Sequence, residues 1–330
     1  MEKGQTAVDQ VFLELTNHCN FSCSFCATGQ MQRKRGFMDT QLALRLLGEI
    51  SEEKLASRVL FHVMGEPLLH PRLANIVRYA RGLGLSPVVY TNGSLLHTAK
   101  ATRVLESGLT ELVISLHSKD SRHHELRKAD GIRYEDYLSR ICNFIEARYS
   151  KAVETTIRLE MMNTLGSNYK ILDSEDDVLS FIRWWASFLR TCGLDPDDDP
   201  AESFISGFKR RDYVEHKLLN DFVVGLKPMG RWVNAKEVAA AKKAGIVAYK
   251  GICSALQSHF TVLWNGDFDV CCSDYDGENV LGNVSSIRLG DLWADARVQK
   301  ARMDFRDGLL ALPYCLICES VPKFKAIYDQ

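Results

Sequence analysis

Three cysteines stand within eight residues near the N-terminus, in the string CNFSCSFC. Cys19, Cys23 and Cys26 can supply three thiolates to a [4Fe–4S] cluster, which takes four cysteine ligands when the protein holds it completely. The fourth iron would then lack a protein ligand and could bind a reactant. A zinc knuckle is the alternative, although zinc sites usually combine Cys-x2–4-Cys pairs that lie apart in the sequence. The spacing therefore favours a reactive iron–sulfur centre.

Strands and helices are expected to alternate along the first two thirds of the chain, in the pattern of a fold built from βα units. Apolar segments predict strands at residues 11–16, 58–64, 86–91, 111–116, 155–161 and 221–226. Helical periodicity predicts helices at about 39–53, 71–83, 97–107, 135–149 and 176–191. Six units are too few for an eight-stranded barrel. The three cysteines directly follow the first strand, at the end where βα barrels carry their catalytic groups.

Polar residues also follow the next predicted strands. In MGEPLLHP, after the second strand, Gly65 permits close backbone approach and Glu66 can bind a cation. Asn92 ends the third strand and Ser115 ends the fourth, although either residue could instead bond its own turn. Arg158 is embedded in the fifth strand, so it needs a carboxylate or phosphate partner. That partner is either a bound ligand or a structural ion pair.

The cysteine spacing resembles that of the radical S-adenosylmethionine (SAM) superfamily. This resemblance implies an α/β fold with a partial (β/α)6 barrel, and a [4Fe–4S] cluster whose open iron binds SAM. In that family an electron from the cluster cleaves SAM to a 5′-deoxyadenosyl radical. The family carries an aromatic residue before the last cysteine, and here this residue is Phe25.

The same resemblance assigns roles to the strand-end residues. Residues 64–66 resemble the family's Gly-Gly-Glu motif, with Met64 in place of the first glycine, and Glu66 would bind the SAM ammonium group. Asn92, Ser115 and Arg158 would line the SAM pocket. A flavodoxin- or ferredoxin-type protein would supply the electron.

Five further cysteines lie in the last quarter of the chain, and their spacing resembles the SPASM and twitch domains of radical SAM enzymes, including aminocyclitol dehydrogenases. The resemblance implies an auxiliary [4Fe–4S] cluster held by Cys253, Cys271, Cys315 and Cys318. A four-cysteine zinc site is the alternative. Cys272 could replace Cys271 as a ligand or donate a hydrogen atom to a substrate radical, although strand alternation would place it on the opposite face.

Two clusters favour the oxidation of an alcohol. A substrate that loses the hydrogen beside a hydroxyl becomes a ketone by losing one more proton and one electron, which the auxiliary cluster can accept. We therefore expect a dehydrogenase-like oxidoreductase of natural-product biosynthesis, acting on a secondary alcohol of a sugar, aminocyclitol or nucleoside. Epimerisation or dehydration of a carbohydrate, or modification of a peptide, are alternatives. His62, His117 and Glu160 could each serve as the base.

The chain is expected to comprise a core barrel (1–194), a last barrel strand with an insertion that could act as a lid (195–250), and a small α+β cluster domain (251–330). Asn265 and Gly266 predict the turn of a β-hairpin in the last part.

Composition narrows the partners and the compartment. The 330 residues carry a net charge of −1, which indicates neither a nucleic-acid partner nor a membrane surface. Ten cysteines and a polar N-terminus without a secretory signal predict a cytoplasmic protein.

Overall fold

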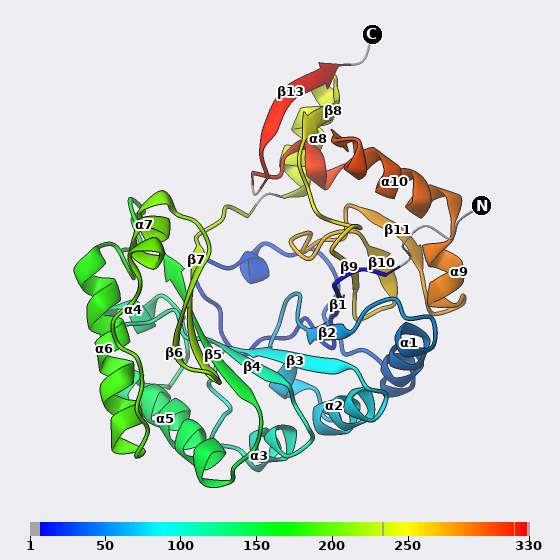
Figure 1. Cartoon of the computed structure of the whole chain (residues 1–330). Coiled ribbons are helices and arrows are strands. Elements are labelled where there is room, and N and C mark those ends of the chain that lie inside the picture. Colours follow the sequence, from blue (N-terminus) through cyan, green and yellow to red (C-terminus); the bar gives the residue numbers. More distant parts are fainter. Residues whose placement is uncertain (1–6, 233, 320, 329–330) are drawn as a thin grey trace. The chain divides into compact units, whose positions relative to one another are not determined.

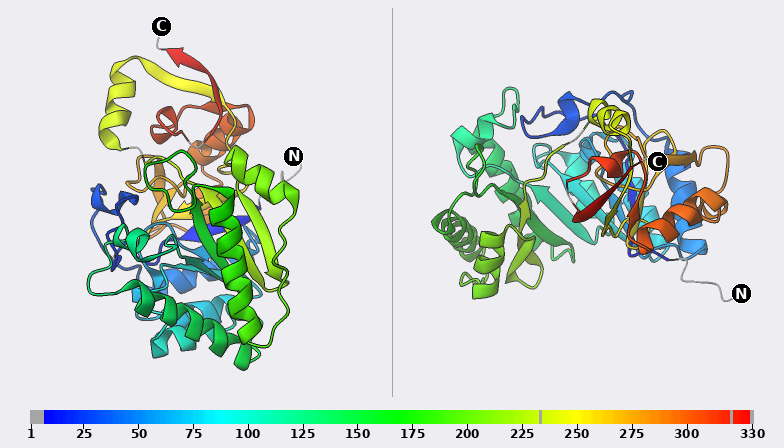
Figure 2. Two further views of the ribbon diagram at one scale, coloured as in Figure 1. Left: turned by 90° about the vertical axis from the view of Figure 1, so that its left-hand side faces the viewer. Right: turned by 90° about the horizontal axis from the view of Figure 1, so that it is seen from above.

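Helices alternate with strands over the first half of the described chain, as the sequence predicts for that part (Figures 1 and 2). The structure is a computed structural model that describes residues 7–232, 234–319 and 321–328. None of its helices, within those residues, is long and apolar enough to cross a lipid bilayer.

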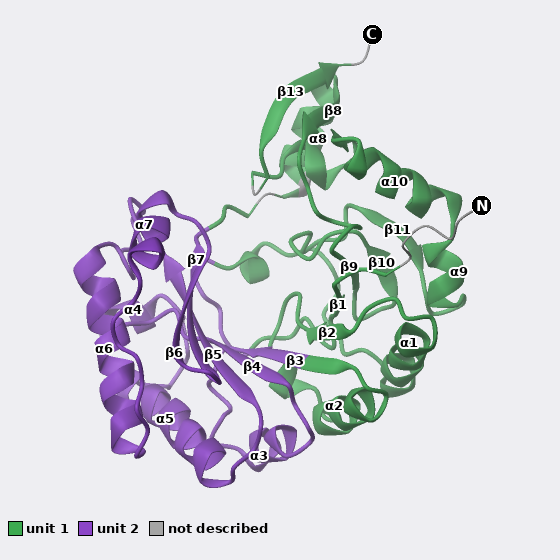
Figure 3. Cartoon of the chain, in the orientation of Figure 1, with its two compact units in different colours: residues 1–19, 26–87, 230–330 green, residues 20–25, 88–229 purple. Residues whose placement is uncertain are grey.

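The chain forms two compact units (Figure 3). Unit 1 contains residues 1–19, 26–87 and 230–330, and unit 2 contains residues 20–25 and 88–229. The division passes through the cysteine loop, so that Cys19 and Cys26 belong to unit 1 and Cys23 to unit 2. The boundaries of these units differ from the domain boundaries expected at residues 194 and 250. The three expected domains stay a prediction.

Unit 1 contains a sheet with the strand order β11-β10-β9-β1-β2. Its strands are β1 (Gln10–Leu13), β2 (Arg58–Phe61), β9 (His259–Val262), β10 (Asp267–Asp269) and β11 (Val280–Asn283). Strand β1 is parallel to both β2 and β9, whereas β10 is antiparallel to β9 and β11. The hairpin predicted at Asn265-Gly266 is confirmed, with Gly266 at φ +87° in its turn. The C-terminal hairpin therefore extends the sheet begun by the first strand of the chain.

A second, smaller sheet of unit 1 has the order β12-β8-β13 and carries the antiparallel C-terminal strand (Figure 1). Its strands are β8 (Ile246–Gly251), β12 (Leu309–Leu310) and β13 (Lys323–Tyr328). The helices of unit 1 are η1 (Ala27–Gly29), α1 (Thr40–Glu52), η2 (Pro67–Leu69), α2 (Leu73–Gly82), α8 (Ala235–Lys243), α9 (Leu289–Trp293), α10 (Ala296–Arg306) and η3 (Tyr314–Leu316).

Unit 2 contains strands in the order β3-β4-β5-β7-β6. They are β3 (Ser86–Thr91), which belongs to unit 2 from Val88 on, β4 (Glu111–Ser115), β5 (Thr156–Asn163), β6 (Val214–Leu219) and β7 (Phe222–Pro228). All neighbours are parallel except β6, which is antiparallel to β7. The helices are α3 (Ala99–Leu105), α4 (Ser121–Glu125), α5 (Tyr134–Ser150), α6 (Glu175–Thr191) and α7 (Glu202–Arg210).

Helix α6 shows why these segments adopt their structure. The Ser174 hydroxyl accepts a hydrogen bond from the Asp177 N–H at its start, and acidic residues fill the first turn, where the helix dipole favours negative charge. Its buried residues recur at helical spacing: Val178, Phe181, Ile182, Trp185, Ala186 and Leu189. Full burial of side chains of this size stabilises the packed helix by about 1.5–3 kcal/mol each.

All six predicted strands and all five predicted helices are present, with ends that shift by a few residues. Besides the predicted last strand β7, the insertion contains α7, β6, α8 and most of β8. Strand β6 extends the sheet of unit 2, which the charged sequence of the insertion did not indicate.

Candidate metal centres

The turn at residues 64–66 packs directly against the segment that leads into the cysteine loop. Gly65 has φ +79°, and a Cβ atom there would lie 2.5 Å from the Thr16 carbonyl oxygen and 2.7 Å from that of His18. The Glu66 N–H donates a 2.7 Å hydrogen bond to the His18 carbonyl oxygen. Only glycine fits this contact, because a side chain would be both strained and too close to the backbone.

Glu66 itself is fully buried and begins the short helix η2. Its Oε1 atom accepts a 3.0 Å hydrogen bond from the Leu68 N–H. The carboxylate therefore has a defined orientation at the C-terminal side of β2, next to the approach to Cys19.

A buried ion pair joins this turn to the C-terminal hairpin within unit 1. Glu14 is fully buried at the end of β1, and its two oxygens each accept a 2.8 Å hydrogen bond from the Arg33 guanidinium. The same carboxylate accepts bonds from the N–H groups of Met64 (3.3 Å) and Trp264 (3.2 Å). Arg33 also donates to the Tyr275 carbonyl oxygen (2.6 Å). Three segments distant in sequence are thus held at one carboxylate.

In unit 2, Asn92 contacts the cysteine loop through Asn20. The Asn92 amide donates a 2.9 Å bond to the Asn20 side-chain oxygen, and Asn20 donates a 2.8 Å bond to the Ser94 hydroxyl. Phe25 packs edge-on against His117 and Tyr169, with ring centroids 5.9 Å apart in both cases. The end of β3 and the segment that follows β4 therefore contact residues 20–25.

His117 follows β4 and is strained. Its φ is +43°, and its Nδ1 atom is buried without a hydrogen-bond partner in the described part of the chain. Burial, followed by the charges of Arg127 and Lys227, holds the pKa of His117 well below its usual value. The ring is therefore neutral at pH 7.

Ser115 and Arg158 are engaged within the protein. The Ser115 carbonyl oxygen accepts a 2.9 Å bond from Arg127. Arg158 donates to Glu111 (2.6 Å), to the Tyr213 hydroxyl (3.0 Å) and to Glu215. Burial lowers the pKa of Arg158, but these partners raise it overall. The structural ion pair, one of the two possibilities left open by the sequence, accounts for the contacts of Arg158.

Cys253, Cys315 and Cys318 lie close to one another beside η3. Burial raises the pKa of the Cys315 thiol, and the charges of Cys253 and Cys318 raise it further. The sulfur of Cys253 accepts a 3.5 Å bond from the Ala255 N–H, and that of Cys315 accepts a 3.7 Å bond from the Asn279 amide.

Cys271 lies near Tyr314 of η3. Burial raises the pKa of the Tyr314 hydroxyl, and the charge of Cys271 raises it further. The Cys271 sulfur accepts a 3.3 Å bond from the Ser273 N–H. Strand β10 ends at Asp269, so the strand alternation expected for Cys271 and Cys272 does not apply to them. The bond to Ser273 and the proximity to Tyr314 favour Cys271 as the ligand.

Among the residues that the structure describes, no three Cys, His, Asp or Glu side chains are placed to hold one metal ion. A [4Fe–4S] cluster uses a different iron for each cysteine, so its ligands need not meet at one point. Soft thiolates that accept N–H hydrogen bonds are the donor set of such clusters. The C-terminal cysteines fit this description.

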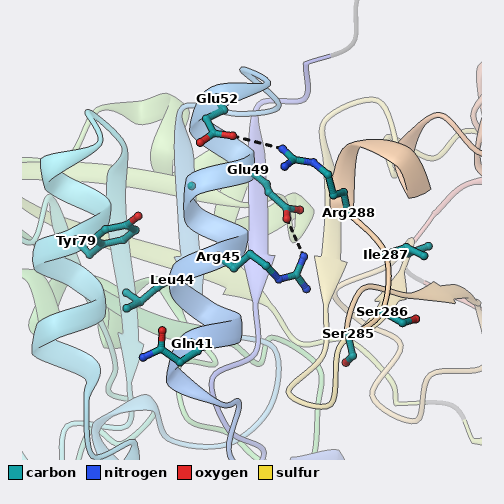
Figure 4. Close-up of a pocket in the computed structure, with 11 residues that line it drawn as sticks. Gln41, Leu44, Arg45, Glu49, Glu52, Tyr79, Ser285, Ser286, Ile287 and Arg288 are labelled. Carbon is teal, nitrogen blue, oxygen red and sulfur yellow. Dashed lines mark hydrogen bonds and ion pairs between the residues drawn. The ribbon is translucent and has the colours of Figure 1, made fainter.

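An open cavity of about 620 Å³ lies between α1, α2 and the segment before α9 (Figure 4). Its charged groups are already paired, as Arg45 binds Glu49 (2.7 Å) and Arg288 binds Glu52 (3.4 Å). None of the residues predicted to carry chemistry lines it.

Several residues at these centres were not found from the sequence. Asn20 lies inside the cysteine motif, which was a usable signal, whereas Glu14, Arg33, Arg127 and Asn279 carry no distinctive pattern. Their importance follows from burial and from partners far away in the chain.

The two cysteine-containing regions of the chain each match a known protein family. Residues 13–165 match the radical SAM superfamily, and residues 253–319 match the iron–sulfur cluster-binding SPASM domain. The chain therefore carries a radical SAM domain followed by a SPASM domain, and these imply SAM and two [4Fe–4S] clusters as cofactors.

Individual relatives cover only parts of the chain. The AdoMet-dependent heme synthase of Oleidesulfovibrio alaskensis is 26% identical over 176 residues, which are 53% of this chain and 45% of the relative. The S-adenosyl-L-methionine-dependent 2-deoxy-scyllo-inosamine dehydrogenase of Niallia circulans is 30% identical over 109 residues, which are 32% of this chain and 44% of the relative. This chain thus spans less than half the length of either protein.

The crystal structure of BtrN in complex with AdoMet and 2-DOIA has a TM-score of 0.53 and 16% identity, and the match covers 97% of this chain and 98% of BtrN. At that identity the likeness concerns the fold alone. The predicted fold class, a partial radical SAM barrel with a small C-terminal cluster domain, is confirmed.

Proposed function

We propose that this chain is a dehydrogenase-like radical SAM oxidoreductase that converts a secondary alcohol of a sugar, aminocyclitol or nucleoside to a ketone. The observation that carries this proposal is the C-terminal cysteine group, in which Cys315 is buried and neighbours Cys253 and Cys318. A cluster held entirely by protein has no iron left for a reactant, which suits it to electron transfer. The partial similarity to 2-deoxy-scyllo-inosamine dehydrogenase supports the choice of substrate class.

We assign Cys19, Cys23 and Cys26 to the cluster that binds SAM, and Cys253, Cys271, Cys315 and Cys318 to the auxiliary cluster. Gly65 and the buried Glu66 would bind the amino-acid part of SAM, since Glu66 offers a carboxylate to its ammonium group. Asn92, Ser115 and Phe25 would shape the remainder of the SAM pocket. We leave Arg158 with its carboxylate partners, and we treat Cys272 as a secondary candidate for hydrogen donation.

When bound, SAM and the two clusters supply a radical that removes one hydrogen atom and an acceptor for one electron. The substrate must also release one proton from its hydroxyl group. His117 is our candidate for that proton, because its buried Nδ1 has no partner among the described residues and its lowered pKa keeps the ring neutral. We also propose that the enzyme is cytoplasmic and receives electrons from a flavodoxin- or ferredoxin-type protein.

Labelled alcohols test this function. The reconstituted protein is incubated anaerobically with SAM, a reductant and sugars or aminocyclitols that carry deuterium on the alcohol carbon. We expect deuterium in 5′-deoxyadenosine and one ketone for each 5′-deoxyadenosine formed. Recovery of an epimer or a dehydrated product instead of a ketone would contradict the dehydrogenase function, as would turnover of peptides alone.

A further inference from the structure

The small sheet of unit 1, β12-β8-β13, exposes hydrophobic side chains (Figure 1). Of the large hydrophobic side chains in the described residues, the three most exposed are Phe324 (68%), Ile252 (64%) and Tyr328 (58%). Phe324 and Tyr328 lie on β13 at the edge of the sheet, and Ile252 directly follows β8. Phe324 is the extra residue of a β-bulge, which turns a side chain out of the regular pattern. Exposed aromatic side chains grouped in this way mark a surface that another molecule covers.

The same part of the molecule is strongly basic. Helix α8 and strands β8 and β13 together contain six lysines and one acidic residue, Glu237, in a chain whose net charge is −1. Glu237 is already bound to Arg231. Within the described residues, none of the six lysines takes part in an ion pair. Five of them are exposed: Lys236, Lys242, Lys243, Lys250 and Lys325.

Two of these lysines are direct neighbours across the sheet. Lys250 on β8 is paired with Lys325 on β13, and the two strands are antiparallel. Like charges at directly opposite positions destabilise such a pair of strands. Lysine on an edge strand discourages the pairing of two sheets. This explanation does not account for Lys250, because β8 is the central strand of the sheet. A negatively charged partner at this surface would remove the repulsion.

The basic sheet adjoins the C-terminal cysteine group. Strand β8 ends two residues before Cys253, and β13 begins at Lys323, five residues after Cys318. Strand β8 also packs against η3, which contains Cys315. The Lys323 Nζ donates a 3.1 Å hydrogen bond to the carbonyl oxygen of Leu316 in η3. A protein bound to this sheet would therefore lie next to the proposed auxiliary cluster.

We propose that the exposed part of this sheet around Lys250, Lys325, Phe324 and Tyr328 docks an acidic one-electron carrier protein, of the iron–sulfur or flavin type, that takes the electron from the auxiliary cluster. This inference rests on the proposed function, in which the substrate radical gives one proton to a base and one electron to that cluster. The cluster must lose the electron before the next turnover. It then returns to its oxidised state, and the carrier is reduced by one electron. The lysines attract the carrier, and the aromatic side chains give it an apolar contact.

The probes are an acidic [2Fe–2S] ferredoxin and an acidic flavodoxin, whose association and dissociation rates with the reconstituted holoprotein are measured by surface plasmon resonance. Lys250→Glu/Lys325→Glu should lower the association rate about tenfold at low ionic strength, because charge steers the encounter. The difference should vanish at about 1 M salt, where the Debye length is about 3 Å. Phe324→Ser should instead speed dissociation at both salt concentrations. Lys54→Glu/Lys217→Glu is the matched control: it reverses two exposed lysines outside this sheet and should leave both rates unchanged.

Rapid-freeze electron paramagnetic resonance then follows the reduced auxiliary cluster, whose spectrum does not change with SAM, after the oxidised carrier is added. In Lys250→Glu/Lys325→Glu the cluster should be re-oxidised about tenfold more slowly than in wild type, at unchanged iron content. Equal losses in this variant and the control, or no binding of either carrier to wild type, would overturn the docking surface. A wild-type dimer that Phe324→Ser converts to monomers would also overturn it, because a second copy would then cover the surface. Carrier binding and re-oxidation without ketone formation from any alcohol would refute the proposed function and leave the docking surface standing.

Discussion

The two cysteine groups of this chain differ in how the protein assembles them. Cys19, Cys23 and Cys26 come from one loop of eight residues after β1. The four C-terminal cysteines come from three separate segments, and N–H donors bond several of their sulfurs. The loop is a local motif that other elements position, whereas the second group exists only when distant segments fold together.

Two buried carboxyl groups lie beside the C-terminal cysteine group. Near Cys271, Asp269 and Asp274 are fully buried, and burial is the main cause that raises the pKa of both carboxyl groups. A raised carboxyl pKa favours the neutral form of these acids, although the nearby Arg33 opposes this effect at Asp269.

The largest effect should come from the cysteine loop. Cys26→Ala should abolish SAM cleavage, because the cluster would keep two cysteine ligands, but it should leave about four irons in the auxiliary centre. 5′-Deoxyadenosine formation and iron content of the reconstituted variant check this expectation. Cys142→Ala, which changes a half-buried cysteine of α5, is the control. If Cys26→Ala lost all its iron, the two centres could not be independent.

The next effect concerns the Glu14–Arg33 ion pair, which connects the loop after Cys26 to the C-terminal hairpin. Glu14→Gln removes the carboxylate that accepts two hydrogen bonds from the largely buried Arg33 and should cost about 3–5 kcal/mol of unfolding free energy. Chemical denaturation measures this loss, with the exposed pair Arg297–Asp295 as control through Asp295→Asn. Equal losses of unfolding free energy in Glu14→Gln and Asp295→Asn would contradict a role of Glu14 in connecting these segments.

Gly65→Ala should have a smaller effect, confined to the turn at residues 64–66. The substitution places a side chain at positive φ and 2.5 Å from the Thr16 carbonyl oxygen, so it should cost about 1–3 kcal/mol and weaken SAM binding. Isothermal titration of SAM into the holoprotein and thermal unfolding would measure the two effects. Gly84→Ala is the control, since Gly84 also has positive φ but has no neighbour within 4 Å. Normal SAM affinity in Gly65→Ala would contradict the proposal that the turn at residues 64–66 binds SAM.

The smallest effect is a pH dependence. Because folding lowers the pKa of His117, the unfolded chain binds more protons there, and stability should fall as pH drops below about 6.5, by at most about 1.4 kcal/mol per pH unit. His117→Asn, in which Asn tolerates the positive φ, should reduce this slope between about pH 7 and 5.5. Exposed His97→Asn is the control. Identical slopes in wild type and His117→Asn would contradict the buried neutral ring.

Local signals predicted much of this molecule. Every expected strand is present because each carries its own apolar pattern, and the N-terminal cysteine motif is recognisable because its three cysteines lie within eight residues. The pairing of β9 with β1 was not predictable, since it joins segments that are about three quarters of the chain apart. Arg127 and Glu14 were missed for a related reason: a charged residue in sequence gives no sign that it is buried. Arg158 shows the converse, because its partners Glu111 and Glu215 become visible only when the strands are paired.

The most direct test of the two-centre account is the iron and sulfide content of wild type and Cys315→Ala/Cys318→Ala, together with 5′-deoxyadenosine and ketone formation. We predict about eight irons in wild type and about four in the variant. The variant should still cleave SAM but should form no ketone. About four irons in both proteins, or undiminished ketone formation by the variant, would contradict an auxiliary cluster that accepts the substrate's electron.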